Sequence, residues 1–334
     1  MIQTRHLKMA ARFAVGRMRE LHPFEVQAVL LNACNLKCVY CRCPEVATRV
    51  LTTEQWRSLI RGLAALGTLR IKFQGGEPTL RKDFRDLCAE SQAAGILTAV
   101  ISNGYAIADN PALLDHVDEL VVSLDSPRAA VNDALRGAGC LEKATRAIEL
   151  GRARGRRVFV NMVLTKDNVD DLEAMLEFCE ARGVGMNAQP VAFGGVNYDD
   201  GARPLALTTE QIHDVHHRLI AWRRAGRPLM FSAEAYSKAL GWTSFDKLSS
   251  PSQGESSCMA GKDYIHIDAN GDVRPCVQHG GPFQPRNAVH DGLEVALRNA
   301  QRHECGDCWI AYLNERKLVF GLQPKALLEV LRRG

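Results

Sequence analysis

The sequence predicts an α/β fold in which helices cover a largely parallel sheet, and two observations support this prediction. Between residues 24 and 190, short apolar runs typical of strands alternate with segments whose apolar residues recur at helical spacing. Each strand is followed by a helix or by a turn toward one. Because repeated strand–helix units build parallel sheets, the sheet is either open and doubly wound or curved into an incomplete (β/α) barrel. In both arrangements, ligands bind at the carboxyl ends of the strands.

The predicted elements follow one another with local start and stop signals. Residues 24–31 form the first strand. Thr52 and Gln55 have the spacing of a capping box that starts a helix over 52–66, and Gly67 follows as its stop. The later elements are strand 70–74, helix 82–94, strand 97–102, a short helix near 111–116, strand 120–124, helix 141–154, strand 157–164, helix 168–182 and strand 184–189.

The alternation of strands and helices ends near residue 190. Residues 190–207 are rich in Gly, Pro and Asp, and a helix is predicted over 208–225. Residues 264–276 have the pattern of a hairpin, with Asn270 and Gly271 at its turn. This hairpin lies in a cysteine-containing stretch that we expect to form a small appended domain.

Composition and charge narrow the classes of function. The chain has 334 residues, 46% of them hydrophobic, and a formal net charge of +4. The basic residues are dispersed, so we expect no nucleic-acid partner. The chain has neither a secretory signal pattern nor an apolar run long enough to span a membrane, so a cytoplasmic location is predicted. In that reducing compartment, clustered thiols indicate metal ligands or redox groups rather than structural disulfides.

The N-terminal segment, residues 1–22, reads as a basic amphipathic helix. Leu7, Ala10, Ala14 and Met18 fall on one apolar stripe, with basic residues beside it. A helix packed on the body of the protein is the favoured interpretation, and a surface for a membrane or a partner is the alternative.

Three cysteines follow the first predicted strand at close spacing, Cys34, Cys38 and Cys41. Three thiolates can bind three corners of one cubane iron–sulfur cluster and leave the fourth iron open. Structural zinc sites usually have four ligands, and Cys43, one residue beyond the triplet, has no evident role. At the end of the second predicted strand stands "GGEP", whose glycines allow close backbone approach to a ligand and whose glutamate can pair with an ammonium group.

In these two motifs the sequence resembles the radical S-adenosylmethionine (SAM) superfamily. The resemblance implies a partial (β/α)6 TIM-like barrel over residues 23–225, with a small C-terminal auxiliary-cluster domain over 226–334. In that family the three cysteines of the motif hold a [4Fe–4S] cluster, and the amino and carboxylate groups of SAM bind its open iron. The resemblance assigns these three ligands to Cys34, Cys38 and Cys41.

The resemblance also assigns SAM contacts to the loops that follow successive strands. Tyr40 is expected beside the adenine, and Arg136 of "NDALRG" is expected to meet the SAM carboxylate. The "GGEP" motif is expected to contact the methionyl ammonium. The full set of expected SAM-binding residues is Tyr40, Gly75, Gly76, Glu77, Pro78, Ser102, Asn103, Ser123, Asp125, Arg136 and, as a ribose contact, Asn161.

A second set of cysteines lies near the C-terminus, Cys258, Cys276, Cys305 and Cys308. Four thiolates complete the ligand set of one [4Fe–4S] cluster or of one zinc ion. The Cys-x12-Gly-x4-Cys spacing resembles the opening of the SPASM extension of radical SAM enzymes. No cysteine follows Cys308, so the shortened "twitch" form with one auxiliary cluster is predicted. His279 and His303 are alternative ligands, although ordinary histidines near the cluster are the favoured interpretation.

The resemblance implies an enzyme reduced by a one-electron donor such as flavodoxin or ferredoxin. Reductive cleavage of SAM then yields a 5′-deoxyadenosyl radical that abstracts a hydrogen atom from the substrate. An auxiliary cluster with four protein ligands has no open iron, so it is predicted to accept an electron. We therefore expect an oxidoreductase in natural-product or cofactor biosynthesis, by dehydrogenation or bond formation. The alternatives are a redox-neutral addition, decarboxylation or rearrangement, and a non-catalytic metal-binding protein.

The substrate is less constrained by the sequence. Many relatives that modify peptides carry a leader-binding domain before the cysteine motif, whereas 33 residues precede Cys34 here. A small-molecule substrate is therefore favoured over a peptide or a lipid-linked substrate. No catalytic acid or base is assigned, because solvated loop positions are the favoured interpretation of Tyr198, Asp199, Asp200 and Glu234.

Overall fold

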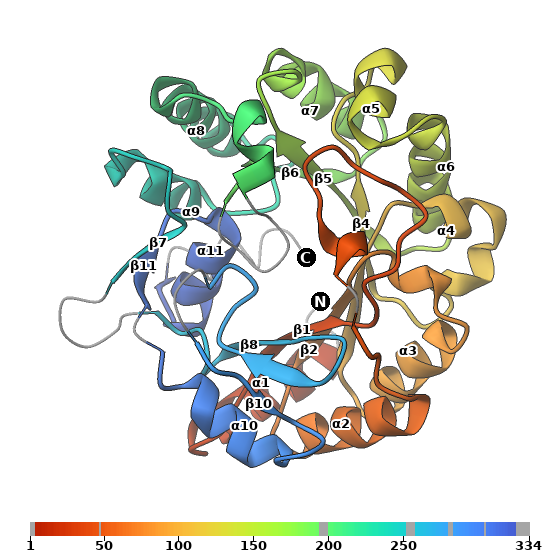
Figure 1. Ribbon diagram of the computed structural model, residues 1–334, viewed down its shortest axis with the longest axis vertical. Helices are drawn as coiled ribbons and strands as arrows, with labels where there is room; N and C mark the ends of the chain where they lie inside the picture. The colour runs from red at the N-terminus through yellow and green to blue at the C-terminus, as the bar shows by residue number, and fades with distance from the viewer. Residues whose placement is uncertain are drawn as a thin grey trace.

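A computed structural model describes residues 4–46, 48–193, 200–251, 258–279, 283–303 and 305–324, and Figure 1 shows their arrangement. Among these residues one sheet has nine strands in the order β10-β9-β8-β1-β2-β3-β4-β5-β6. From β8 to β6 all neighbours pair in parallel. The strands are β1 (Glu25–Val29), β2 (Arg70–Gln74), β3 (Leu97–Ser102), β4 (Glu119–Ser123), β5 (Arg157–Leu164), β6 (Gly185–Pro190), β8 (Tyr264–Ile267), β9 (Asp272–Arg274) and β10 (Arg286–Asn287).

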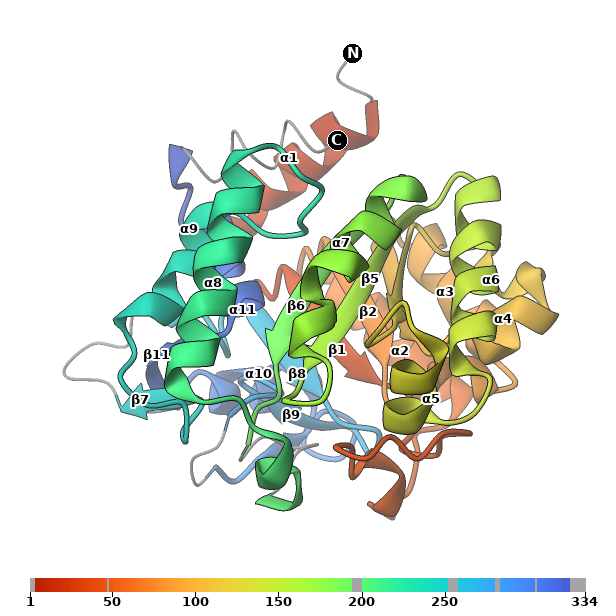
Figure 2. The same cartoon turned by 90° about the horizontal axis from the view of Figure 1, so that it is seen from above.

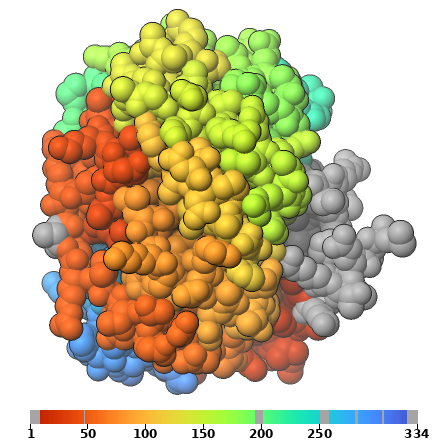
Figure 3. Space-filling view, turned by 90° about the vertical axis from the view of Figure 1, so that its right-hand side faces the viewer, coloured from red at the N-terminus to blue at the C-terminus, as the bar shows by residue number. Residues whose placement is uncertain are grey.

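Helices form an arc outside the curved sheet, so the fold is the partial (β/α) barrel that the sequence predicts (Figure 1). Figure 3 shows the side on which the helices of the first barrel units pack into a continuous surface. The α-helices are α1 (Thr4–Arg17), α2 (Thr53–Ala65), α3 (Phe84–Ala93), α4 (Tyr105–Asp109), α5 (Ala129–Arg136), α6 (Cys140–Ala153), α7 (Leu172–Ala181), α8 (Thr209–Arg224), α9 (Ala233–Ser237), α10 (Leu293–Ala300) and α11 (Ala311–Phe320).

Local signals explain where the helices begin. The predicted capping box at the start of α2 is confirmed: the Gln55 N–H donates to the Thr52 hydroxyl at 3.2 Å, and the Thr52 N–H donates to Gln55 Oε1 at 2.9 Å. Thr208 and Gln211 cap α8 in the same way. The apolar face of α2, which includes Trp56 and Leu63, is buried against the sheet core, as its helical periodicity predicts.

The C-terminal part of the chain adds strands to the barrel sheet beyond β1. The predicted hairpin exists as β8 and β9, but β8 also pairs with β1, aligning Tyr264 with Glu25. The strands β6 and β8 do not pair, and Leu229 forms an isolated bridge to Met186 beside that opening. A second, two-stranded sheet joins β7 (Ser249–Pro251) to β11 (Cys305–Cys308). The predicted division near residue 225 thus crosses a shared sheet, and it stays a prediction.

Helix α1 lies across one end of the molecule (Figure 2). Its Arg12 guanidinium donates to the carbonyls of Ala64 and Ala94, at the ends of α2 and α3 that lead into strands. Its Phe13 ring lies 4.6 Å from the Phe24 ring between centroids. The contacts agree with a helix packed on the body of the protein. Within the described residues, no helix is long and apolar enough to cross a membrane.

Candidate active site

A cavity of about 250 Å³ lies at the carboxyl ends of the barrel strands. Residues from the loop after β1, from "GGEP" and from β3 to β6 face it together, as expected for a parallel barrel. Of the SAM contacts expected from the sequence, the cavity is lined by Tyr40, Gly75, Gly76, Glu77, Ser102, Asn103, Ser123, Arg136 and Asn161. Pro78 and Asp125 are not part of its described lining.

The cysteine triplet stands at the wall of this cavity. Cys34, Cys38 and Cys41 are half-buried and all three line it. The Leu36 N–H points to the Cys34 sulfur at 3.4 Å, and the Cys38 thiol points to the Arg136 carbonyl at 3.8 Å. Burial raises the pKa of Cys38 to about 12. The three thiols are therefore presented to one space, in an environment that keeps them protonated unless a metal centre replaces the proton.

Cys43 lies next to the triplet and is more deeply buried, with 2% of its surface exposed. It begins the 3-10 helix η1 (Cys43–Glu45) and also lines the cavity. Burial raises its pKa to about 12. The structure thus places this fourth thiol beside the expected cluster ligands without assigning it a ligand role.

The two glycines of "GGEP" allow the second loop to pack directly against the cysteine loop. A Cβ atom on Gly76 would lie 2.2 Å from the Ala33 carbonyl oxygen, and one on Gly75 would lie 2.1 Å from that of Leu31. The Gly76 N–H donates to the Leu31 carbonyl at 2.8 Å. Both glycines also line the cavity, so the sequence prediction that they admit a ligand stays a prediction, and the structure adds their close contact with the backbone of the cysteine loop.

Glu77 is buried at the centre of a polar cluster. Its Oε1 accepts hydrogen bonds from the hydroxyls of Thr79 at 2.5 Å and Ser102 at 2.9 Å, and its Oε2 accepts one from the Asn103 N–H at 2.7 Å. Burial raises the pKa of this carboxyl, and the hydrogen bonds oppose that shift. Because it borders the cavity, the carboxylate can receive a ligand ammonium while staying in a fixed orientation.

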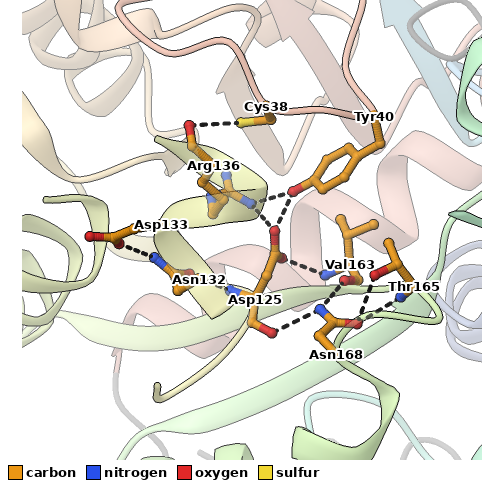
Figure 4. A network of polar contacts seen from close by, with 9 residues as sticks. All are labelled: Cys38, Tyr40, Asp125, Asn132, Asp133, Arg136, Val163, Thr165 and Asn168. Carbon is orange, nitrogen blue, oxygen red and sulfur yellow. Dashed lines mark hydrogen bonds and ion pairs between the residues drawn. The ribbon is translucent and has the colours of Figure 1, made fainter. Parts of the chain in front are cut away.

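A second buried network holds Arg136 in place (Figure 4). The guanidinium of Arg136 donates to Asp125 Oδ2 at 2.9 Å and to the Tyr40 hydroxyl at 2.6 Å. The Tyr40 hydroxyl in turn donates to Asp125 at 2.5 Å. Burial alone would lower the pKa of Arg136, but the Asp125 carboxylate raises it. Asp125 has no exposed surface, so its structural role is to orient Arg136 and Tyr40 from behind the cavity wall.

The side chain and the backbone of Asp125 are also held by the neighbouring units. The Val163 N–H donates to Asp125 Oδ1 at 2.9 Å, and the Asn168 amide donates to the Asp125 carbonyl at 2.8 Å (Figure 4). On the adjoining strands, Ser123 and Asn161 are register partners, and the Asn187 amide donates to Asn161 Oδ1 at 2.8 Å. These contacts give the cavity a polar wall built from β4, β5 and β6.

The four C-terminal cysteines gather at a separate place. Cys305 and Cys308 lie on β11, and Cys276 follows β9. A hydrogen bond between Cys258 and Cys305 lowers the pKa of Cys305 to about 6, and burial raises the pKa of Cys308 to about 12. Burial is the main cause that raises the pKa of Cys276. The nearby Cys308 and Cys305 raise it further through their charges. All four thiols therefore form one group, and none is in the described lining of the cavity.

Both cysteine sets fit iron–sulfur clusters by the chemistry of their donors. Clusters are bound by thiolates, each on its own iron, and the metal charge stabilises the deprotonated form that burial disfavours. Four thiolates also form the ligand set of a structural zinc ion, so at the C-terminal set the donors fit either centre.

Of the two histidines considered as alternative ligands, His303 has a protein partner at each ring nitrogen. Its Nε2 bonds to the Ala260 carbonyl at 2.7 Å, and its Nδ1 accepts from the Cys305 N–H at 3.2 Å. The ring of His279 lies 6.0 Å from the ring of His303 between centroids. Both histidines therefore lie near the C-terminal cysteines, as the sequence places them.

Some residues that line the cavity belong to none of the motifs found in the sequence. Gln27, Lys72, Gln189 and Tyr312 line it, the last from α11. A lysine in the middle of the apolar strand "RIKFQ" is the single local signal that could have pointed to this set. Of the acid–base candidates, Tyr198, Asp199 and the side chain of Asp200 lie outside the described part of the chain, and Glu234 is not part of the described lining.

Comparisons with known proteins agree with this geometry. Residues 29–179 match the radical SAM superfamily. Over 271 residues the chain is 30% identical to the mycofactocin maturase MftC of Mycolicibacterium smegmatis, covering 78% of this chain and 64% of MftC. It is 30% identical over 213 residues to the PqqA peptide cyclase of Granulibacter bethesdensis, covering 59% of this chain and 56% of that enzyme. The chain thus spans less than two thirds of the length of these two curated relatives.

Solved structures show the same fold. Streptococcus suis SuiB bound to S-adenosylmethionine superposes with a TM-score of 0.66 over 93% of this chain and 78% of SuiB, at 19% identity. The structure of anSMEcpe with bound AdoMet superposes with a TM-score of 0.63 over 92% of this chain and 98% of anSMEcpe, at 15% identity.

Proposed function

Because the chain belongs to the radical SAM superfamily, we propose that it cleaves SAM reductively and uses the resulting radical to oxidise a substrate bound in the barrel cavity. When bound, the two clusters would supply one-electron chemistry, reduction of SAM at the first and oxidation of the substrate radical at the second. Cys34, Cys38 and Cys41 would hold the first cluster, and Cys258, Cys276, Cys305 and Cys308 the second.

The arrangement of the cavity walls carries this proposal. One wall contains the cysteine triplet, and another contains Val277 and Ile310, which adjoin the auxiliary cysteines Cys276 and Cys308 in the chain. A substrate in the cavity is therefore close to both sets of thiols. Loss of a hydrogen atom to the radical, followed by loss of one electron and one proton, is a net two-electron oxidation. This geometry favours oxidation over the redox-neutral alternatives.

The chain's own residues would bind and orient SAM. Glu77 is held by three hydrogen-bonding partners and borders the cavity, so we propose that it receives the SAM ammonium. Arg136 is held by Asp125 and Tyr40, while its buried Nε has no hydrogen-bond partner in the described structure. We propose that Arg136 meets the SAM carboxylate, with Asp125 as a positioning residue. Preorganised groups of this kind reduce the cost of orienting the bound molecule.

The names of the relatives indicate a class of substrate. MftC is named a maturase, the PqqA cyclase acts on a peptide by its name, and SuiB has been solved with its precursor peptide SuiA. We therefore propose that this chain modifies a peptide, in place of the small molecule that the sequence alone favours. The one-electron donor stays a proposal as well, with a flavodoxin or a ferredoxin as its class.

Formation of 5′-deoxyadenosine tests the proposed function. The full chain, reconstituted anaerobically with iron and sulfide, is mixed with SAM and dithionite, and the products are quantified. We expect 5′-deoxyadenosine and methionine in equal amounts. Zinc uptake without SAM cleavage would overturn the proposal and favour a metal-binding protein. With substrate in hand, a continuous need for external reductant without an oxidised product would favour a redox-neutral reaction instead.

A further inference from the structure

A buried lysine faces the cavity, and the chemistry described so far makes no use of it. Lys72 lies in the middle of β2, with 5% of its surface exposed, and lines the cavity. Its Nζ lies 3.6 Å from Glu25 Oε1 and 5.2 Å from the centroid of the Tyr312 ring. A charged group with so little exposure needs a partner, because burial of an uncompensated ammonium is costly.

The nearest carboxylate is engaged mainly by another cation. Arg316 Nε lies 2.5 Å from Glu25 Oε2, and its NH2 donates to Oε1 at 3.2 Å. The Lys72 ammonium stands beyond hydrogen-bond distance of the same carboxylate, and no hydrogen bond to it is found within the described residues. Burial lowers the pKa of Lys72 to about 8, although Glu25 opposes the shift. Glu25 thus holds this ammonium without satisfying its donors.

Two further polar atoms on the cavity wall lack partners. Gln189 Nε2 and Gln278 Oε1 are buried, and neither has a hydrogen-bond partner in the described structure. One is a donor and the other an acceptor, so a ligand that carries both an acceptor and a donor, as an amide does, can satisfy them. Burial of an unsatisfied polar group costs free energy, and a ligand that supplies the missing partner removes that cost.

We propose that Lys72 binds a carboxylate of the substrate, and that this substrate carries an amide close to its carboxylate. The inference deepens the proposed function, on which it rests, by naming the substrate class. The apolar lining beside these groups, Met230, Phe231 and Ile310, would take the substrate's hydrocarbon portion. A substrate carboxylate would accept a charge-assisted hydrogen bond from the Lys72 ammonium.

A carboxylate fits this place better than a phosphate. Phosphates are commonly recognised by forked arginine donors, and the buried arginines near Lys72 are engaged with protein carboxylates. Arg70 pairs with Glu119, and Arg316 pairs with Glu25. Besides Lys72, the cavity lining on β1 and β2 consists of neutral amides, Gln27, which is the register partner of Lys72 on β1, and Gln74. One lysine among neutral amides matches a single negative charge.

Binding of matched probes tests the inference without requiring turnover. N-acetyl-L-leucine carries a carboxylate next to an amide and an apolar side chain, and N-acetyl-L-leucinamide is its neutral counterpart. Titration calorimetry is run on the reconstituted full chain with SAM, at pH about 7 so that the carboxylate is charged. We expect wild-type protein to bind the carboxylate probe at least about tenfold more tightly than the amide probe.

The variants separate the charge of Lys72 from its structural role. Lys72→Met should abolish the preference for the carboxylate probe, and Lys72→Arg should restore part of it. Lys166→Met removes an exposed lysine outside the cavity lining and should leave the preference intact. Iron content and thermal melting establish that each variant is folded. If Lys72→Met does not fold, Lys72→Gln takes its place, because its amide can still donate toward Glu25.

The outcomes are distinct from those that test the proposed function. No preference for the carboxylate in wild-type protein, or a preference that survives loss of the lysine, would overturn the inference. Tighter binding of inorganic phosphate than of N-acetyl-L-leucine would also overturn it. Absence of SAM cleavage would overturn the proposed function but not the binding result, because the binding experiment needs no cleavage.

Discussion

The two cysteine regions differ in what surrounds them. Cys34, Cys38 and Cys41 are half-buried on a loop that borders the cavity, next to Glu77 and Arg136. In the C-terminal region, Cys276 and Cys308 are buried, and the four thiols surround one another away from the described cavity lining. The first region presents three thiols to a space that a small molecule can enter, whereas the four thiols of the second region lie next to one another.

This difference implies a division of labour. A cluster with three protein ligands keeps one iron available to SAM, and a cluster with four does not. Under the proposed function, the first cluster would serve SAM cleavage, and the second would take an electron from the substrate. Four substitutions would break or sharpen this comparison, and their expected effects run from complete loss to none.

Cys41→Ala should have the largest effect. It removes one of three ligands from the first cluster, so we expect loss of that cluster and of all detectable SAM cleavage. Anaerobic iron analysis and quantification of 5′-deoxyadenosine check this outcome. A variant that retained wild-type cleavage would show that Cys41 is not a ligand.

Cys276→Ala should separate the two regions. Iron content is expected to fall from about eight to about four atoms per chain, with SAM cleavage retained and oxidised product lost. Cys179→Ala is the matched control, since Cys179 is a buried core cysteine on α7 and should leave the iron content unchanged. Retention of full iron content in Cys276→Ala would remove Cys276 from the ligand set.

Gly76→Ala should weaken the first region through the backbone. The added Cβ would lie 2.2 Å from the Ala33 carbonyl oxygen, so the cysteine loop must shift. We expect destabilisation by about 2 kcal/mol or more and reduced occupancy of the first cluster, measured by thermal melting and iron content. Gly241→Ala is the control, because nothing lies within 4 Å of its added Cβ. Equal behaviour of the two variants would contradict the packing argument.

Cys43→Ala should have the smallest effect. Cys43 lines the cavity beside the triplet, but the first cluster is expected to be complete with three other cysteines. Cluster content and SAM cleavage should stay close to wild-type values in the assays used for Cys41→Ala. Loss of the cluster in this variant would mean that the ligands have been assigned incorrectly.

Much of the fold could be predicted because its signals are local. The strands β1 to β6 are short buried runs, and the start of α2 is encoded by Thr52 and Gln55 three residues apart. The pairing of β8 with β1 could not be predicted in the same way, because it depends on segments distant in the chain. The sequence therefore places the hairpin correctly but does not show that it extends the barrel sheet.

The residues of the candidate site also fall into two groups, those that the sequence predicts and those that it does not. Motif residues such as Glu77 and Arg136 could be predicted because they follow successive strands, whose ends converge. The bond from Arg136 to the buried Asp125 carboxylate could not be predicted from the motifs, and the expected SAM contact of Asp125 stays a prediction. Lys72 was missed because its partners, Glu25 and Tyr312, come from β1 and α11 and are brought to it by folding alone.

The response of each cluster to SAM tests the division of labour most directly. Electron paramagnetic resonance spectra are recorded for the reduced Cys276→Ala variant and for a variant with Cys34, Cys38 and Cys41 all changed to Ala, each with and without SAM. The first variant is expected to retain only the cavity-facing cluster, and SAM should change its spectrum. The second is expected to retain only the auxiliary cluster, and its spectrum should stay the same. A spectrum that responds to SAM in the second variant, or fails to respond in the first, would contradict the assignment.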